Sequence, residues 1–339
     1  MTNKVEARFF ERTGWDNVSC WLCPHLCSIA PSRSGACGVR TNRSGTLYLD
    51  TYGRLSHREP VYSDDLPLYH YKPGSSWMQV GSRGCTMRCP FCNTWKQSQV
   101  AGAIAAPVSP DQIVAETAAG RLCGISFGVN EPAHLHEFVV DTFAAARHAG
   151  LDTHVATSGM WCEAPLREIA PYLSAATIGL KGFNDSFYQS ELGGDLATVR
   201  GAIEVFAALG IHLELTWLVI PGRTDSEREA RDLMSFLAAQ GVSPPIILIP
   251  YEPSFTWAET TQPGTLASLQ AFRARFKGYT GAVYEAHPDS AENNTRCTKC
   301  GRTLVRRGMA RLVITSAPET GRPKSQCPTC GTPVPYRID

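Results

Sequence analysis

The chain has 339 residues, of which 43% are apolar and 19% charged, and its formal net charge is +1. This composition fits a folded protein with a large core and excludes an intrinsically disordered chain. No apolar run approaches the length of a membrane span, and the N-terminal residues lack the apolar stretch of a signal peptide. We therefore expect a cytoplasmic protein with no membrane partner.

Cysteine is the most informative residue type in this composition. The chain has 13 cysteines, and all but Cys123 and Cys162 fall into three clusters. Structural disulfides do not persist in a reducing compartment, so clustered cysteines there indicate metal or redox chemistry. The two isolated thiols are most simply explained as buried apolar side chains.

The first cluster is near the N-terminus, in the pattern Cys20-x2-Cys23-x3-Cys27-x9-Cys37. Four thiolates complete a tetrahedral zinc site or a closed iron-sulfur cube equally well. His25 either replaces one ligand or only borders the site. The role is open between a structural staple and an auxiliary cluster that relays electrons or binds substrate.

The second cluster, Cys85-x3-Cys89-x2-Cys92, follows the first expected strand of the central region, at 77–82. Three thiolates on one loop bind three corners of an iron-sulfur cube, whose usual ligand set is four cysteines. One iron then keeps a free coordination position, as in a catalytic metal site. The alternative is a structural zinc site that a distant cysteine closes.

Alternating strands and helices follow this loop. Ser109, Pro110 and Gln112 predict a helix start with a capping box. Further strands are expected at 124–129, 151–157, 176–180, 212–220 and 245–250, with helices at 135–148, 196–209 and 226–239 between them. Six such strands predict a parallel sheet, either a partial barrel or a doubly wound open sheet.

Both architectures bind ligands at the carboxyl ends of their strands, and polar motifs stand at those ends. After the cysteine loop they are Asn130-Glu131-Pro132, Thr157-Ser158-Gly159, Lys181, Pro221-Gly222-Arg223 and Tyr251-Glu252. Any single motif would be an ordinary loop. Together, on one face, they predict an active site that includes the Cys85 loop.

The third cluster pairs Cys297-x2-Cys300 with Cys327-x2-Cys330, with 26 residues between the pairs. Two Cys-x2-Cys-Gly turns facing each other indicate a zinc-ribbon-like site that holds a small domain together. Residues 292–339 include nine Lys or Arg and only three acidic residues. This basic tail is a solvated face of that domain or a surface for nucleic acid or an acidic partner.

The Cys85, Cys89 and Cys92 loop and Glu131-Pro132 resemble the radical S-adenosylmethionine (SAM) superfamily. The resemblance implies a partial (β/α)6 TIM-type barrel whose open iron is chelated by SAM. By the same resemblance Phe91 lies near the adenine, Asn130 and Glu131 near the methionine amino group, and Ser158 near the ribose. In this setting we favour an auxiliary iron-sulfur cluster over zinc on the N-terminal cysteines.

A narrower resemblance covers nearly the whole chain. Segments such as Cys-Trp-Leu-Cys-Pro-His-Leu-Cys and Asn-Asn-Thr-Arg-Cys-Thr-Lys-Cys are similar to the AmmeMemoRadiSam system radical SAM enzymes, relatives of the pyruvate formate-lyase activating enzymes. The family implies a companion protein encoded nearby. Gly179 stands where an aspartate is expected, and 246–250 lacks an expected histidine. The expected division is a Cys-rich module at 1–74, the barrel at 75–288 and the zinc-ribbon-like domain at 289–339.

We therefore predict a radical SAM enzyme, an oxidoreductase that cleaves SAM to a 5'-deoxyadenosyl radical and abstracts hydrogen from a substrate. A flavodoxin-type or ferredoxin-type protein would supply the electron. Cys162 and Lys181 are candidate catalytic residues. The alternatives are an activase for a glycyl-radical enzyme, an aminocarboxypropyl-transferring enzyme, and a metal-stapled binding protein without turnover. A small-molecule or nucleic-acid substrate is slightly favoured over a protein.

Overall fold

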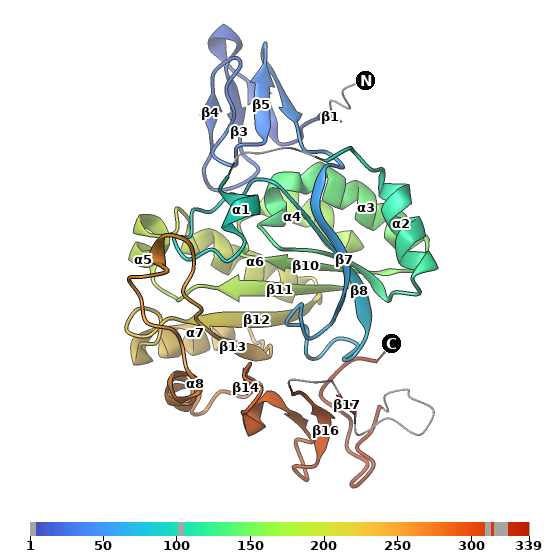
Figure 1. The fold of residues 1–339 in the computed structure, drawn as a ribbon, viewed down its shortest axis with the longest axis vertical. Coiled ribbons are helices and arrows are strands. Elements are labelled where there is room, and N and C mark those ends of the chain that lie inside the picture. The colour runs from blue at the N-terminus through green and yellow to red at the C-terminus, as the bar shows by residue number, and fades with distance from the viewer. Residues whose placement is uncertain (1–4, 101–104, 309–312, 315–324, 339) are drawn as a thin grey trace.

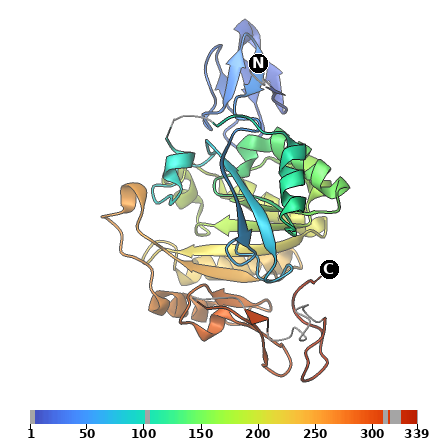
Figure 2. The same cartoon turned by 45° about the vertical axis from the view of Figure 1, so that its right-hand side comes forward.

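The computed structural model describes residues 5–100, 105–308, 313–314 and 325–338. The N-terminal strands and the C-terminal cysteine-rich segment project from opposite ends of a central sheet with its helices (Figure 1), and a rotated view agrees (Figure 2). Arg311, Arg322 and Lys324 of the basic tail lie outside the described residues. No helix among the described residues has both the length and the apolarity that crossing a bilayer requires.

Among the described residues, the central sheet has eight strands in the spatial order β14-β13-β12-β11-β10-β9-β8-β7. Its strands are β7 (Leu55–Tyr62), β8 (Ser76–Ser82), β9 (Gly124–Phe127), β10 (Asp152–Thr157), β11 (Ala175–Leu180), β12 (His212–Val219), β13 (Ile246–Pro250) and β14 (Val283–Glu285). Strands β8 to β14 are all parallel, and β7 pairs antiparallel with β8. The predicted α/β partial barrel is confirmed.

The six predicted strands are all present, with ends shifted by no more than two residues. Their sequences are continuous apolar runs, such as Ile246 to Leu248, because a parallel sheet is buried on both faces. The structure adds β14 as a seventh parallel strand and β7 at the opposite edge. Strand β7 comes from the stretch that the expected division assigns to the N-terminal module.

Helices connect the strands along the outside of the barrel (Figure 1). They are α1 (Trp95–Ser98), α2 (Pro110–Ala119), α3 (His136–His148), α4 (Glu163–Ile169), α5 (Asp185–Ser190), α6 (Leu196–Ala208), α7 (Glu227–Ala239) and α8 (Leu266–Arg273). Helix α2 begins as predicted: Ser109 Oγ accepts from Gln112 N, and the Gln112 side chain accepts from Ser109 N. This capping box fixes the helix that follows the cysteine loop.

The N-terminal module consists of two small antiparallel sheets. One has the order β1 (Val5–Glu6), β6 (Thr46–Leu49), β5 (Arg40–Arg43), and the other has β2 (Phe10–Arg12), β3 (Val18–Cys20), β4 (Ser28–Ile29). Their apolar residues, among them Val18, Leu22 and Leu47, belong to the same core as the barrel. The Arg40 guanidinium forms a buried ion pair with Glu137 of α3. The module is therefore packed onto the barrel.

The C-terminal segment forms a third antiparallel sheet, of β15 (Thr295–Arg296), β16 (Thr303–Arg306) and β17 (Val313–Ile314). Arg307 is buried; it pairs with Asp64 and donates to Tyr69 O at 3.1 Å. The backbone of Arg337 bonds to the segment beside Tyr69, between residues 70 and 72.

The loop between β7 and β8 connects the barrel to this segment. The backbone N–H groups of Tyr69 and His70 donate to Glu214, a fully buried carboxylate on β12, at 2.8 and 2.7 Å. Burial alone would raise the pKa of Glu214, but hydrogen bonds and charge from His212 and His70 lower it. The loop fills the barrel at the end opposite the cysteine loop and joins it to the C-terminal segment.

Candidate functional site

A cavity of about 560 Å³ lies at the carboxyl ends of the parallel strands. Its lining comes from the loops after β8, β9, β10, β11 and β13 and includes the sequence-predicted residues Cys85, Cys89, Phe91, Cys92, Asn130, Glu131, Ser158, Lys181, Tyr251 and Glu252. The structure therefore gathers residues that are up to 167 positions apart in the sequence into one concave site.

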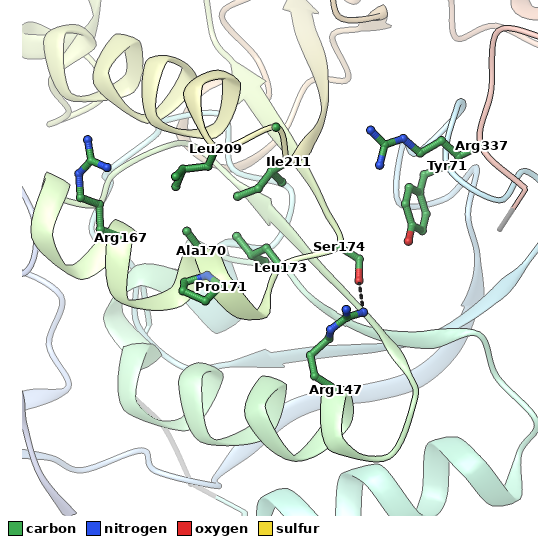
Figure 3. Close-up of a pocket in the computed structure, with 11 residues that line it drawn as sticks. Tyr71, Arg147, Arg167, Ala170, Pro171, Leu173, Ser174, Leu209, Ile211 and Arg337 are labelled. Carbon is green, nitrogen blue, oxygen red and sulfur yellow. Dashed lines mark hydrogen bonds between the residues drawn. The ribbon is translucent and has the colours of Figure 1, made fainter.

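A second cavity, of about 520 Å³, lies at the amino ends of β11 and β12 (Figure 3). Arg147, Arg167 and Arg337 border it, and Arg147 donates to Ser174 Oγ at 3.1 Å. Among the described residues that line it there is no cysteine and no carboxylate. The titratable groups converge on the first cavity, which we take as the functional site.

The three thiols of the cysteine loop have neighbours that suit thiolate ligands. The Met87 N–H donates to Cys85 Sγ at 3.4 Å, and Cys92 Sγ lies 3.1 Å from Ser98 Oγ. Burial raises the pKa of Cys85 to about 11 and that of Cys89 to about 12. Free thiols therefore keep their protons at neutral pH, and a bound cluster must displace them. This buried three-thiol set beside a cavity fits a cluster with one open iron.

Asn130 fixes the beginning of the cysteine loop. Its amide nitrogen donates to the carbonyl oxygens of Ser82, at 2.8 Å, and Gly84. The preceding Val129 has φ +71°, a left-handed conformation that strains a β-branched residue. Glycine would adopt this conformation freely, so valine at position 129 carries a cost in backbone strain.

Glu131 joins the loops after β9 and β10. Its Oε1 accepts from Thr157 Oγ1 at 2.7 Å and its Oε2 from the Ser158 N–H at 2.6 Å. Burial raises the pKa of Glu131, although these hydrogen bonds and the charge of Lys181 oppose the shift. Lys181 Nζ donates to Ser158 Oγ at 3.1 Å and is the one cation among the described residues that line the cavity.

The loop after β13 covers the cysteine loop, which sequence reasoning did not foresee. The Trp257 N–H and the Thr256 hydroxyl donate to Pro90 O at 3.2 and 3.0 Å, and the Ser254 hydroxyl donates to Cys92 O at 3.3 Å. Phe91 packs against Trp257 and Tyr251, with ring centroids 5.3 and 6.2 Å apart. The run Tyr-Glu-Pro-Ser-Phe-Thr-Trp was the available signal, because aromatic residues are rare in solvated loops.

Cys162 lies away from the cavity. It caps α4, is not among the residues that line the cavity, and its N–H donates to Leu22 O of the N-terminal module at 3.0 Å. Its thiol is half-buried. Of the two catalytic candidates, only Lys181 faces the cavity.

Residues 80–234 match the model of the Radical SAM superfamily, and this range holds Cys85, Cys89, Cys92, Glu131 and Lys181. These residues are a radical SAM domain. The domain implies a 4Fe-4S cluster and SAM, and the chain is an enzyme.

Proteins with sequences similar to this chain carry names that describe different activities. The chain is 27% identical over 335 residues to an uncharacterized protein of Methanocaldococcus jannaschii, covering 97% of this chain and 98% of that protein. It is 29% identical over 240 residues to the dual-specificity RNA methyltransferase RlmN of Hyphomonas neptunium, covering 63% of this chain and 59% of that one. It is 24% identical over 177 residues to the pyruvate formate-lyase 1-activating enzyme of Escherichia coli (strain K12), covering 50% and 71%.

Solved structures give a weaker likeness. A radical SAM methyltransferase from Sphaerobacter thermophilus matches with TM-score 0.49 and 18% identity, covering 71% of this chain and 79% of that one.

Proposed function

We propose that this enzyme reductively cleaves SAM at a 4Fe-4S cluster held by Cys85, Cys89 and Cys92 and abstracts hydrogen from a small substrate. The observation that supports the proposal is the convergence of this open triad with Glu131, Ser158 and Lys181 on one cavity. When bound, the cluster and SAM supply a 5'-deoxyadenosyl radical. A cytoplasmic location belongs to the same proposal, because clustered cysteines that bind metal keep their thiols unoxidised in a reducing compartment.

The side chains of the cavity hold and orient the cofactor in this proposal. Lys181 would supply the cation for the SAM carboxylate, and the Glu131 carboxylate, which accepts hydrogen bonds from Thr157 and Ser158, would receive the amino group. Asn130 keeps the cysteine loop in register with β9, and Phe91 bounds the adenine side. Holding donor and acceptor together makes the electron transfer effectively unimolecular.

The covering loop keeps the site dry. Its three hydrogen bonds to Pro90 and Cys92 and the stacked pair of Phe255 and Trp95, with centroids 5.1 Å apart, close the outer side of the cysteine loop. Excluding water protects a reactive radical from side reactions. A cavity of about 560 Å³ that also contains SAM leaves room for a small molecule or one inserted residue, not for a folded domain.

We also propose that the C-terminal quartet, Cys297, Cys300, Cys327 and Cys330, binds zinc. Its four ligand atoms all lie within 4.8 Å of one another, and Cys297 Sγ is 3.5 Å from Cys330 Sγ. Zinc with sulfur ligands at about 2.3 Å needs such tight spacing.

An activase that acts on a protein is the second candidate function of the enzyme, because an activating enzyme is among the relatives. A companion protein and the narrower family remain predictions.

The test is SAM cleavage by anaerobically reconstituted protein reduced with dithionite. We expect 5'-deoxyadenosine and methionine from the wild type, and no product from Cys85→Ala. Cys123→Ala is the matched control, because its thiol lies outside the cavity and should leave the rate unchanged. Absence of cleavage by protein with a loaded triad would overturn the proposal. Deuterium transfer from labelled candidates into 5'-deoxyadenosine separates small substrates from a glycyl protein.

A further inference from the structure

The N-terminal quartet of Cys20, Cys23, Cys27 and Cys37 lies directly on the loop that carries the catalytic triad. The Cys37 carbonyl oxygen is 2.6 Å from the position that a Cβ on Gly84 would take, so only glycine fits there. His25 Nε2 lies 2.5 Å from Thr86 O, within the triad loop. The segments that bear the two ligand sets are thus in van der Waals contact.

Arg88 adds a second connection between the two loops. It stands between Cys85 and Cys89 in the sequence, and its guanidinium donates to Cys85 O at 3.2 Å. The same group donates to Ala36 O, the carbonyl next to Cys37. One side chain therefore bridges the backbones of both ligand sets.

The quartet is surrounded by hydrogen-bond donors. The backbone N–H groups directed at its sulfurs are those of Leu22 at Cys20, His25 at Cys23, Ala36 at Cys27, and Val39 with Arg40 at Cys37. The buried Arg40 guanidinium also acts on Cys20 and Cys37 through its positive charge. Such donors stabilise thiolates and set the reduction potential of an iron-sulfur cluster.

The spacing of the sulfurs separates this quartet from the C-terminal one. Of the described residues, only the C-terminal four bring three or more candidate ligand atoms within 4.8 Å of one another. In the N-terminal quartet no three sulfurs lie within 4.8 Å of one another, although the charges of Cys20, Cys27 and Cys37 all act on Cys23. A cube with iron at alternate corners holds its thiolates farther apart than a single ion does.

The far side of the quartet faces solvent. Trp21 and Leu26, which lie between its cysteines, are 39% and 60% exposed. None of the four cysteines is among the described residues that line the cavity. The site thus has the catalytic loop on one side and an apolar surface on the other, which is the arrangement for electron entry and not for binding substrate.

We propose that the N-terminal quartet holds a second 4Fe-4S cluster that passes electrons from a flavodoxin-type or ferredoxin-type donor to the cluster of the catalytic triad. This inference rests on the proposed function. In each step one electron moves: the donor is oxidised as the outer cluster is reduced, and the outer cluster is oxidised as the inner one is reduced. No bond forms or breaks, and no proton moves, in either step.

Metal content tests the site. Wild type should contain about eight iron and eight sulfide per chain, and Cys23→Ser/Cys27→Ser about four of each, with the C-terminal zinc unchanged. The double variant should also lose one of two reduced-cluster EPR signals. Cys123→Ser is the control and should match the wild type. Wild type with about four iron and two zinc per chain would refute the second cluster.

Electron delivery tests the role. With dithionite, which reaches the triad directly, the double variant should cleave SAM within about twofold of wild type. With photoreduced flavodoxin it should be at least about tenfold slower. Equal flavodoxin-driven rates would overturn the relay, whereas failure of the wild type with dithionite would instead overturn the proposed function.

Arg88→Met keeps the test decisive if the double variant fails to fold. It should retain about eight iron per chain, because no ligand is changed. Reduction of its inner cluster by flavodoxin, followed by rapid-freeze EPR, should slow while dithionite reduction does not. An unchanged flavodoxin rate in this variant contradicts the relay through the Arg88 contact.

Discussion

The two four-cysteine sites lie at opposite ends of one barrel and differ in almost everything except their ligands. The N-terminal quartet shares its apolar core with the barrel and contacts the catalytic loop. Among the described residues, the C-terminal quartet has a separate core of five buried residues: Cys297, Leu304, Val305, Cys327 and Tyr336. Two of those five are proposed zinc ligands, so by this proposal the module depends on its metal for a core.

The difference teaches what each metal contributes. A module that already shares a large apolar core does not need a metal ion to stabilise its fold, so a metal bound there can have a redox role instead. A module whose core is mostly its metal site needs the ion to fold. Neighbours and sulfur spacing, more than the number of cysteines, therefore indicate the function of each site.

The largest expected effect tests this dependence directly. Cys297→Ser removes a ligand of the proposed zinc site, and structural zinc contributes on the order of 10 kcal/mol to folding of such modules. We expect loss of zinc and rapid proteolysis within 289–339. The matched Cys20→Ser should leave the N-terminal module protected, because its apolar core remains. Equal protease sensitivity of the two modules would break the comparison.

The buried arginines that anchor each module provide the next test. Arg40→Ala leaves Glu137 as a buried carboxylate without its ion-pair partner, and Arg307→Ala leaves Asp64 as a partly buried one. Breaking a buried pair costs about 3–5 kcal/mol. We expect the larger loss in free energy of unfolding from Arg40→Ala, because the Glu137 side chain is 2% exposed and that of Asp64 20%.

Anaerobic urea denaturation measures both effects. Glu137→Gln in the Arg40→Ala background should recover part of the loss, because a neutral amide costs less to bury than a charge. A reversed order, with Arg307→Ala the more damaging, would show that the C-terminal anchor and not the N-terminal one is the tighter attachment.

A smaller effect is expected on the pH dependence of the free energy of unfolding, through one buried histidine near each module. Burial lowers the pKa of His70, beneath the C-terminal module, and of His134, beside the catalytic loop, each to about 4. Between pH 6.5 and 4 the unfolded chain binds these protons and the folded one does not, so stability falls as pH falls. The slope is up to about 1.4 kcal/mol per pH unit for one histidine.

His70→Gln and His134→Gln should each reduce that slope, measured as the free energy of unfolding between pH 7 and 5. The stability of each variant should be less dependent on pH than that of the wild type, with the loss greatest near the lower limit. A slope unchanged in both variants would show that the pKa values of these histidines are not lowered in the folded protein.

Substitution of two glycines, Gly84 and Gly301, tests the comparison through losses in the free energy of unfolding. Gly84 and Gly301 both have positive φ, +92° and +72°. A methyl group at Gly84 would also strike Cys37 O at 2.6 Å, whereas nothing lies within 4 Å of the corresponding position at Gly301. Gly301→Ala should cost about 1–2 kcal/mol from backbone strain alone. Gly84→Ala should cost more and should displace the N-terminal module, seen as faster amide exchange around Cys37.

Much of the fold could be predicted because its signals are local. Buried parallel strands are apolar runs, and the Ser109 capping box is contained in four residues. Strand β7 escaped prediction because it contains His57, Arg58 and Pro60, residues typical of an exposed edge. Strand β14 has only three residues, too short for any period to show.

The candidate site likewise has features that local sequence patterns predict and contacts that they do not. The triad and the strand-end motifs are short patterns, and the structure places them around one cavity. The contacts of Arg88 with Ala36 and of His25 with Thr86 join residues 52 and 61 positions apart. No local pattern encodes such pairs, because they arise only when two separately folded loops are brought together.

The loop that covers the triad also sets an order of assembly during synthesis. Thr256, which donates to Pro90 O, follows it by 166 residues. At about 5–20 residues per second, the ribosome needs roughly 8–33 s to make that stretch. Cys85, Cys89 and Cys92 therefore leave the ribosome uncovered, and delivery of the proposed cluster would have that interval before the covering loop exists.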